Sequence, residues 1–395
     1  MLVAVSNGYS RHNVGDWLLL SNAVELVRMA HPGAEVIAIA MDADSFANRL
    51  GTTAVVDAPV TRRAPLRESM LAAVALATRC RLGPARLRRL RMVDRAYSCG
   101  GGFLQMRSAR EVVSVSLVHL VQLALMRRLG IPLTMLPQSV GPFEGRLARA
   151  VARTVLRWFE TVTVRERRSL AHLKELDSEL AARVHVAPDL AFLQPHRPLT
   201  RASAAGRLRI GVVVRQWWFP GAADPRAAYA RYVERVARFI ELARESGHDP
   251  QLVVHSDGPT VRGDDRIAIR DVLAELDEPA AVVDVASERT LDEVTAAYAR
   301  YDMVVSTRLH AALFALSTGV PAAALDYEWK SAGIFDDLGL ADWHRPIDDW
   351  EPGDMLTTVE RLEAYPIADV ATEFERRRAR LEELARALGK KPHIG

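Results

Sequence analysis

The chain has 395 residues, of which 49% are hydrophobic, and a net charge of +3. This length and apolar content predict two domains that each bury a core, and the small net charge argues against a nucleic-acid partner. Cys80 and Cys99 are the only cysteines, so a disulfide framework and a cysteine-rich metal site are excluded.

The chain opens on an apolar run without a charged leader. No segment reaches about 18 uninterrupted apolar residues, the length of a membrane-spanning helix. We therefore expect a cytoplasmic protein in which Cys80 and Cys99 are buried in a reducing compartment.

The first half of the chain alternates short apolar runs with segments of helical periodicity. Strands separated by helices predict parallel βαβ units. The predicted strands lie at 2–5, 36–40, 95–98, 132–136, 161–165 and 184–186, and the predicted helices at 16–30, 67–78, 114–129, 146–159 and 169–176.

The pattern lapses between 193 and 208, which predicts an interdomain linker, and then resumes. The second series has predicted strands at 209–214, 251–255, 281–284, 302–305 and 321–325, and predicted helices at 229–246, 265–275, 291–299 and 311–316. A last helix at 367–388 carries its apolar residues on one face.

We predict an α/β protein of two doubly wound Rossmann-like domains that face a cleft, similar to the B-type glycosyltransferases. The predicted N-terminal domain spans 1–195, and the predicted C-terminal domain spans 206–345. A helical extension at 346–395 is expected to pack back across the domains.

Small polar residues follow the strands of the first domain. Ligands of such folds bind beyond the carboxyl ends of the strands, so these loops are candidates for sugar contacts. Turn formation and helix capping explain the same residues without a ligand, and both interpretations stay open. The candidates are Asn13, Asp16, Gly101, Gly102, Gln138, Ser139 and Arg165.

Residues 306–312 predict a strand, a tight turn and a helix that begins near Arg308 and His310. A helix N-terminus attracts anions, a guanidinium can bind phosphate or carboxylate with two donors, and an imidazole can move a proton near neutral pH. The histidines show no HxH or HExxH spacing, so no metal is expected. Arg215 lies at another strand end, beside Trp217 and Trp218.

An arginine cluster in the first domain has little acidic balance. It either attracts a membrane surface or a lipid-linked anionic acceptor, or it is a solvated basic helix. Its members are Arg79, Arg81, Arg86, Arg88, Arg89, Arg91 and Arg95.

Taken in order, these loops resemble the polysaccharide pyruvyl transferase family. The resemblance covers about Asn7 to Leu340, and its most specific element is Arg308-Leu309-His310-Ala311. The other matching elements are residues 13–16, 100–102, 137–142, Arg165-Glu166 with Ser169, Pro188-Asp189, 327–330 and 337–339.

The resemblance implies transfer of pyruvate from phosphoenolpyruvate onto two hydroxyls of a sugar, giving a cyclic ketal. It implies that the domain at 1–195 supplies the acceptor side and that the domain at 206–345 supplies the phosphoenolpyruvate side. It also implies that Arg308, Leu309 and His310 contact phosphoenolpyruvate and that His310 is the general acid. Arg215 and Lys330 are the candidates for a second cationic contact, and Asp16 is the candidate base. Phosphoenolpyruvate is then a co-substrate, no cofactor is needed, and the saccharide is free, nucleotide-linked or lipid-linked.

Two other functions stay open. A nucleotide-sugar glycosyltransferase of the same architecture would use Arg308 for a diphosphate and Asp326 or Glu328 for the donor ribose. A non-catalytic sugar-binding protein would keep the same loops without the chemistry.

Overall fold

The computed structural model describes residues 1–46, 49–50, 52–61, 65–82, 84–197, 206–260 and 263–390. The chain divides into two compact units. Unit 1 comprises Met1–Arg11, Asp16–Leu193 and the chain from Arg377, and unit 2 comprises His12–Gly15 and Gln194–Arg376. The predicted linker lies partly outside the described residues, at 198–205.

Unit 1 is built on a seven-stranded sheet in the order β3-β2-β1-β4-β6-β8-β9. All neighbouring strands in this sheet are parallel, as the alternation of strands and helices predicts. Its strands are β1 (Leu2–Gly8), β2 (Glu35–Ala40), β3 (Ala54–Asp57), β4 (Arg95–Ser98), β6 (Leu133–Gln138), β8 (Phe159–Val164) and β9 (Val184–Val186), and a separate parallel pair is formed by β5 (Leu104–Met106) and β7 (Val140–Phe143).

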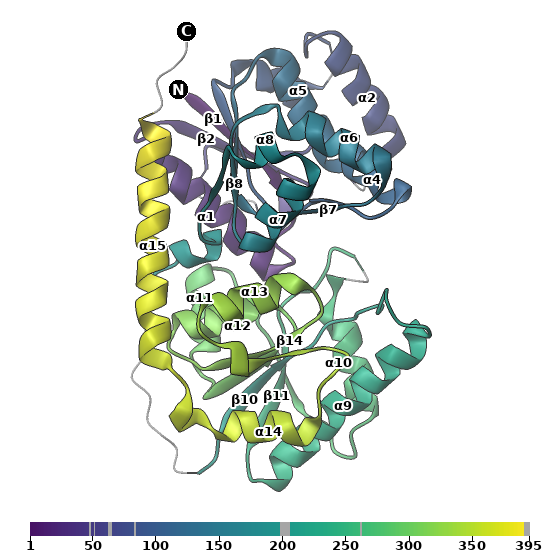
Figure 1. The fold of residues 1–395 in the computed structure, drawn as a ribbon, viewed down its shortest axis with the longest axis vertical. Helices are drawn as coiled ribbons and strands as arrows, with labels where there is room; N and C mark the ends of the chain where they lie inside the picture. The colour runs from purple at the N-terminus through teal and green to yellow at the C-terminus, as the bar shows by residue number, and fades with distance from the viewer. Residues whose placement is uncertain are drawn as a thin grey trace. The chain divides into compact units, whose positions relative to one another are not determined.

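Helices connect these strands (Figure 1). They are α1 (Val14–Ala30), α2 (Pro65–Ala77), α3 (Ala85–Arg89), α4 (Ala109–Val115), α5 (Val121–Leu129), α6 (Gly145–Leu156), α7 (Arg167–Leu176) and α8 (Ser178–Ala181). Short 3₁₀ turns lie at Ala43–Phe46, Leu90–Met92 and Leu190–Leu193.

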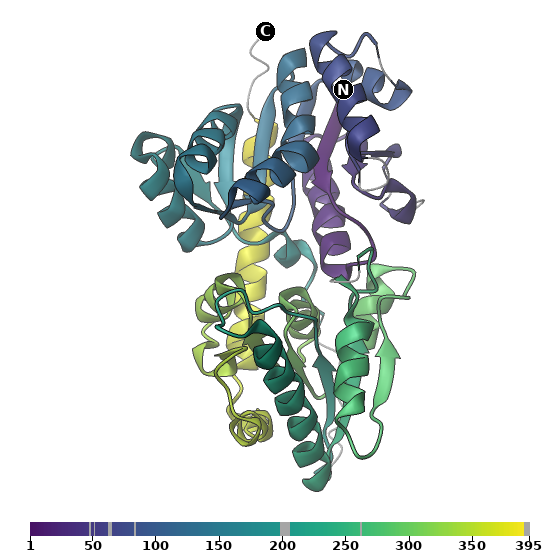
Figure 2. The same cartoon turned by 90° about the vertical axis from the view of Figure 1, so that its right-hand side faces the viewer.

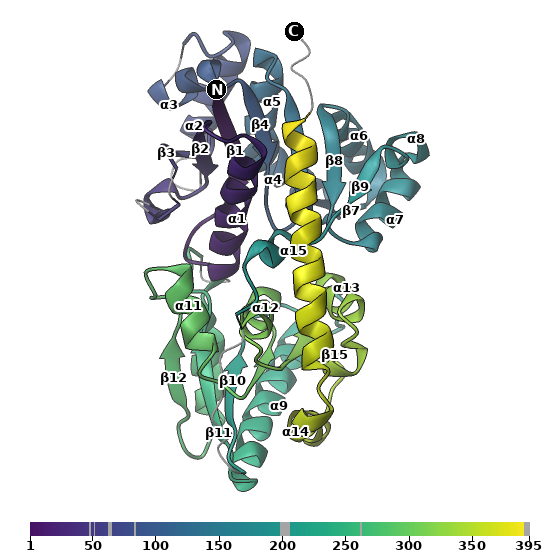
Figure 3. The ribbon, with the colours of Figure 1, turned by 90° about the vertical axis from the view of Figure 1, so that its left-hand side faces the viewer.

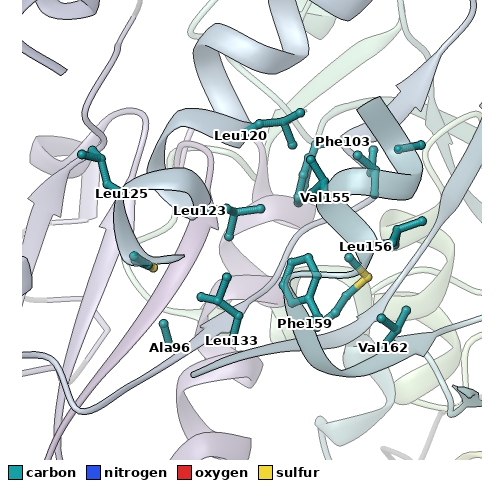
Figure 4. Packing of buried hydrophobic residues seen from close by; sticks show 14 of the residues in the cluster. Ala96, Phe103, Leu120, Leu123, Leu125, Leu133, Val155, Leu156, Phe159 and Val162 are labelled. Atoms are coloured by element: carbon teal, nitrogen blue, oxygen red, sulfur yellow. The ribbon is translucent and has the colours of Figure 1, made fainter. Parts of the chain in front are cut away.

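The core of unit 1 lies where the sheet meets α5 and α6 (Figure 4). Leu133 and Phe159 from the strands pack in one cluster with Leu123 of α5 and Val155 of α6. Cys80 and Cys99 are buried, as expected.

The helical stretch Ala109–Leu129 has the length and composition of a membrane-spanning helix, alone among the helices that the structure describes. A π-helical turn at Ser116–Leu120 interrupts it. Leu120, Leu123 and Met126 are buried in unit 1, so one side of this helix is part of the core.

Unit 2 is built on a six-stranded sheet in the order β12-β11-β10-β13-β14-β15, again with parallel neighbours. Its strands are β10 (Arg209–Val213), β11 (Asp249–Val254), β12 (Ala281–Asp284), β13 (Met303–Ser306), β14 (Ala322–Asp326) and β15 (His344–Pro346). Its helices are α9 (Pro225–Glu245), α10 (Asp265–Ala274), α11 (Leu291–Tyr298), α12 (Leu309–Ser317), α13 (Trp329–Asp337) and α14 (Pro352–Glu360), with 3₁₀ turns at Ala341–Trp343 and Leu362–Ala364.

Both sheets have the Rossmann-like order in which the winding reverses beside the first strand. The reversal lies between β1 and β4 in unit 1 and between β10 and β13 in unit 2. Such a switch point opens a crevice beyond the carboxyl ends of the two strands, which is where ligands bind in this class of fold. The fold therefore indicates two candidate ligand-binding crevices, one in each unit.

The last helix, α15 (Ile367–Gly389), is one continuous element (yellow in Figure 3). Its residues up to Arg376 belong to unit 2 and those from Arg377 to unit 1, so the stretch expected as a separate extension at 346–395 is shared between the units. In unit 2 the Phe374 ring lies 5.7 Å from the His196 ring, and in unit 1 the Arg377 guanidinium lies 5.0 Å from the Phe192 ring.

Candidate active site

In unit 2 the chain turns sharply between β13 and α12, at the switch point. Arg308 is the N-cap residue of α12 and has extended backbone angles. Ser306 holds the turn, because its Oγ accepts a hydrogen bond from Arg308 N at 2.9 Å and donates one to Arg308 O at 2.8 Å. His310 is thereby placed in the first turn of α12, as the sequence predicts.

The Arg308 guanidinium is held by a buried carboxylate that the sequence did not reveal. Arg308 is 8% exposed, and its Nε lies 3.0 Å from Asp265 Oδ1, while Nη2 donates to Gly263 O at 2.9 Å. Burial raises the pKa of Asp265, and the Arg308 guanidinium opposes this shift. Arg308 therefore points in a fixed direction, as a preorganised anion-binding group requires.

Asp265 is itself fixed by the first residues after β11. Its Oδ2 accepts hydrogen bonds from His255 N at 3.1 Å and Ser256 N at 2.9 Å. His255 is fully buried, and burial lowers its pKa, with Arg308 and His310 as further causes. Burial therefore favours the neutral form of the His255 imidazole, whose Nδ1 lies 2.8 Å from the Tyr298 hydroxyl.

Half-buried His310 packs directly on the segment His12–Gly15, which belongs to unit 2 although it follows β1 in the chain. A Cβ atom at Gly15 would lie 2.5 Å from His310 Nδ1, so only glycine leaves room for the imidazole. Asn13 forms an isolated bridge to Ser256, and its Oδ1 accepts a hydrogen bond from Gly15 N at 3.0 Å. Asn13, expected on the acceptor side, is thus a turn residue of unit 2.

The same segment carries a histidine–carboxylate pair. His12 Nδ1 lies 2.8 Å from Asp257 Oδ1, and the His12 side chain is 36% exposed. A carboxylate on one ring nitrogen fixes the tautomer and orientation of an imidazole. The partners are 245 residues apart in sequence, so no local pattern could have identified the pair.

Two further cations lie at the carboxyl ends of strands next to β13. Arg215 follows β10, and its Cζ lies 4.1 Å from the Tyr327 ring and 5.3 Å from the Trp217 ring. Lys330 lies in the first turn of α13, after β14, with Nζ 3.3 Å from Glu328 Oε2. Since β10, β13 and β14 are neighbours in a parallel sheet, Arg215, Arg308 and Lys330 follow the same edge.

In unit 1 the candidate residues gather at the switch point between β1 and β4. Gly100 has a φ of +141°, and a Cβ there would lie 3.5 Å from Asn7 O and 3.8 Å from Gln138 Oε1. A Cβ at Gly101 would lie 4.0 Å from Asp16 Oδ1. Asp16, the glycine loop and Gln138 are therefore neighbours in unit 1.

Gln138 has an unusual environment for a buried amide. It is 0% exposed, yet neither its Nε2 nor its Oε1 has a hydrogen-bond partner within the described part of the chain. An unsatisfied buried amide is costly and is often associated with a ligand or an ordered water. Gln138 thus remains a candidate for a contact to a sugar hydroxyl.

Arg165 and Ser139 lie beneath these loops and are engaged by other protein groups. Arg165 is paired with Asp189 and Glu166, and its Nη2 donates to Gly101 O at 2.9 Å. Ser139 Oγ donates to Glu166 Oε2 at 3.0 Å and accepts from Arg165 Nε at 2.8 Å. These contacts position the glycine loop that contains Gly101 and Gly102.

Comparison with known proteins identifies the family of the chain. The sequence profile described as Polysaccharide pyruvyl transferase matches residues 13–328. Amylovoran biosynthesis protein AmsJ of Erwinia amylovora is 26% identical over 275 residues, which is 66% of this chain and 63% of AmsJ. The chain thus matches less than two thirds of the length of this relative.

Solved structures share the fold at low sequence identity. A UDP-GlcNAc 2-epimerase of Methanocaldococcus jannaschii has a TM-score of 0.58 at 9% identity and covers 99% of this chain and 100% of its own. The spinosyn rhamnosyltransferase SpnG has a TM-score of 0.50 at 14% identity, with 98% and 99% coverage. These similarities support the fold, two Rossmann-like domains as in B-type glycosyltransferases.

The profile match covers both units and includes Asn13 to Asp16 at its start and Arg308 to His310 near its end. These are the segments that unit 2 brings into contact. The chain belongs to the polysaccharide pyruvyl transferase family.

Proposed function

We propose that this protein transfers the pyruvyl group of phosphoenolpyruvate onto two hydroxyls of a saccharide, forming a cyclic ketal. The observation that carries the proposal is the placement of Arg308 and His310 at the N-terminus of α12, beside the switch point of unit 2. Membership of the family and the similarity to AmsJ, which is named for amylovoran biosynthesis, support a saccharide acceptor.

The donor carries a phosphate and a carboxylate, so it requires two cationic contacts. Arg308 has a fixed orientation and lies at a helix N-terminus, which favours a doubly charged phosphate. Arg215, whose guanidinium lies against the Tyr327 and Trp217 rings, and Lys330 are the candidates for the carboxylate. Arg308, Arg215 and Lys330 follow neighbouring parallel strands, which is why we assign all three cations to one donor molecule.

His310 is proposed to protonate C3 of the enol, which makes C2 electrophilic. The first sugar hydroxyl adds to C2, phosphate leaves, and the second hydroxyl adds to the resulting oxocarbenium ion. Two hydroxyl protons are released. One replaces the proton that His310 gave to C3, and the other leaves on inorganic phosphate, so the reaction is balanced.

Two groups are candidates for accepting a hydroxyl proton. Asp16, the candidate base from the sequence, lies beside the glycine loop of unit 1. The His12–Asp257 pair lies in unit 2, on the segment that contacts His310. We favour the pair, because an imidazole oriented by a carboxylate is a competent base near neutral pH.

A nucleotide-sugar glycosyltransferase would use Asp326 or Glu328 for the donor ribose. Asp326 Oδ2 lies 2.6 Å from His344 Nδ1, and Glu328 is paired with Lys330. Asp326 Oδ1 has no hydrogen-bond partner in the described part of the chain, so these contacts do not decide between the two donors. The family match is what favours pyruvyl transfer.

Ligand-dependent thermal unfolding tests the proposal. A ligand at about one hundred times its Kd stabilises the folded state by about 2.7 kcal/mol. Phosphoenolpyruvate should raise the melting temperature and a nucleotide sugar should not. Stabilisation by the nucleotide sugar alone would identify a glycosyltransferase, and stabilisation by saccharides alone would identify a binding protein.

A further inference from the structure

The helix α2 of unit 1 exposes an apolar face to solvent. Met70 is 72% exposed and Val74 is 44% exposed, and Ala73 and Ala77 are exposed with them. The spacing of these residues puts them on one face of the helix. A solvent-facing apolar stripe on a helix indicates a binding partner, since isolated apolar side chains on a surface are common but continuous faces are rare.

The stretch that follows α2 in the chain carries further exposed apolar residues and exposed arginines. Leu82 in the following turn is 60% exposed, and Met92 is 59% exposed. The exposed arginines of the same stretch are Arg79, Arg81, Arg88, Arg89 and Arg91. The side chain of Arg86 lies outside the described residues, and Arg95 is buried and paired with Glu160, so Arg95 does not belong to this surface.

The stretch has almost no acidic counterpart. Glu68 is the only acidic residue between 67 and 93 in the sequence. Its Oε2 accepts hydrogen bonds from Thr61 N at 2.6 Å and from Thr61 Oγ1 at 2.8 Å. The exposed guanidinium groups therefore produce a local positive potential even though the whole chain carries only +3.

A groove between α2 and α5 continues the same surface. Ala73, Leu76 and Ala77 line it from α2, and Arg127, Arg128 and Trp158 line it from the other side. Figure 1 shows α2 and α5 at the periphery of unit 1, and Figure 2 shows α2 and α3, in dark blue, from another side. We call the surface formed by the exposed residues of α2, by Arg79, Arg81, Leu82, Arg88, Arg89, Arg91 and Met92, and by this groove the α2–α3 face.

We propose that the α2–α3 face docks on an anionic lipid surface. Guanidinium groups bind lipid phosphates, and their aliphatic stems lie along apolar surface while the charge stays in the headgroup layer. Methionine and leucine side chains between them can enter the acyl boundary. A nucleic acid would match the charge but not the exposed Met70, Leu82 and Met92. The proposal does not depend on the ketal chemistry.

Co-sedimentation with lipid vesicles tests the proposal on the full chain. We expect binding to vesicles that contain phosphatidylglycerol, little binding to pure phosphatidylcholine, and release by high salt. The triple variant Arg88→Glu, Arg89→Glu, Arg91→Glu should weaken binding at least about tenfold, since each basic residue near the surface contributes. The double variant Met70→Ser, Leu82→Ser should weaken it without a change of charge.

A matched control separates a local effect from an effect of net charge. Arg270→Glu, Arg300→Glu, Arg376→Glu makes the same change of charge at exposed positions of unit 2 and should bind vesicles like the wild type. Thermal unfolding confirms that the variants are folded. Equal loss of binding in the control, or equal binding to both lipids, would overturn the proposal. So would wild-type self-association in sedimentation velocity that Met70→Ser, Leu82→Ser abolishes, because the face would then bind a second copy.

Discussion

Gly15 and His310 are in direct contact, and the contact exists because residue 15 has no side chain: a Cβ there would lie 2.5 Å from His310 Nδ1. The segment that includes Gly15 and the helix that carries His310 are both parts of unit 2, although 295 residues of sequence separate the two positions. The position of the His310 ring therefore requires glycine at residue 15.

Gly15→Ala should displace the His310 ring and lower the rate of phosphate release. A misplacement of about 1 Å at a catalytic group can cost about a hundredfold in rate. Gly353→Ala is the matched control, since a Cβ at Gly353 in α14 meets nothing within 4 Å. Equal activities of the two variants would show that the contact has no catalytic role.

Asp265→Ala should destabilise the fold. It leaves the Arg308 guanidinium buried without its carboxylate, and breaking a buried ion pair costs about 3–5 kcal/mol. Urea unfolding measures the change in free energy of unfolding. The surface pair Arg238–Glu241 is the control, and Glu241→Ala should cost less than about 1 kcal/mol. A similar small loss for Asp265→Ala would mean that the pair does not fix Arg308.

His12→Gln should lower kcat by about a hundredfold if the imidazole accepts a hydroxyl proton, with KM for phosphoenolpyruvate little changed. Asp257→Asn should cause a smaller loss, because it removes the group that orients the ring rather than the base itself. Asp277→Asn at an exposed position is the control. If Asp16→Asn is inactive while His12→Gln retains full activity, the base is Asp16.

The raised pKa of His344 predicts that the free energy of unfolding depends on pH. Its hydrogen bond to Asp326 is the main cause that raises the pKa of His344 above 6.5, and Asp336 on the other ring nitrogen adds to the shift. Because the pKa of His344 is higher in the folded state than in the unfolded state, protonated His344 stabilises the fold. This stabilisation is complete below pH 6.5 and is lost as the pH rises through the raised pKa. Urea unfolding of His344→Gln should lack this part of the pH dependence, and an unchanged profile would contradict the assignment.

The fold was predictable to a large extent because buried parallel strands are continuous apolar runs. The strands β1, β4, β10 and β13, which form both switch points, were all predicted near their observed positions. The strands β3, β5, β7 and β15 were not predicted. Two of them are not apolar runs, because β7 contains Gly141 and Pro142 and β15 contains His344 and Arg345. In particular, β5 and β7 lie in segments that were expected to be loops.

The site was predictable only in part, for a physical reason. Arg308 and His310 could be identified since a local motif places both at a helix N-terminus. Asp265 and Asp257 could not, because their roles arise from partners 43 and 245 residues away. Arg165 is a candidate ligand contact in the sequence, and its burial with Asp189 and Glu166 could not be predicted, because Asp189 is 24 residues away.

The proposed reaction depends on protonation of C3 of phosphoenolpyruvate by His310. This step can be tested by mass spectrometry of saccharides incubated in heavy water with phosphoenolpyruvate and either the wild type or His310→Gln. We predict that the wild type forms a pyruvyl ketal with one deuterium in its methyl group and that His310→Gln, although folded, forms almost none. Ketal formation by His310→Gln at a rate near that of the wild type would show that His310 is not the acid.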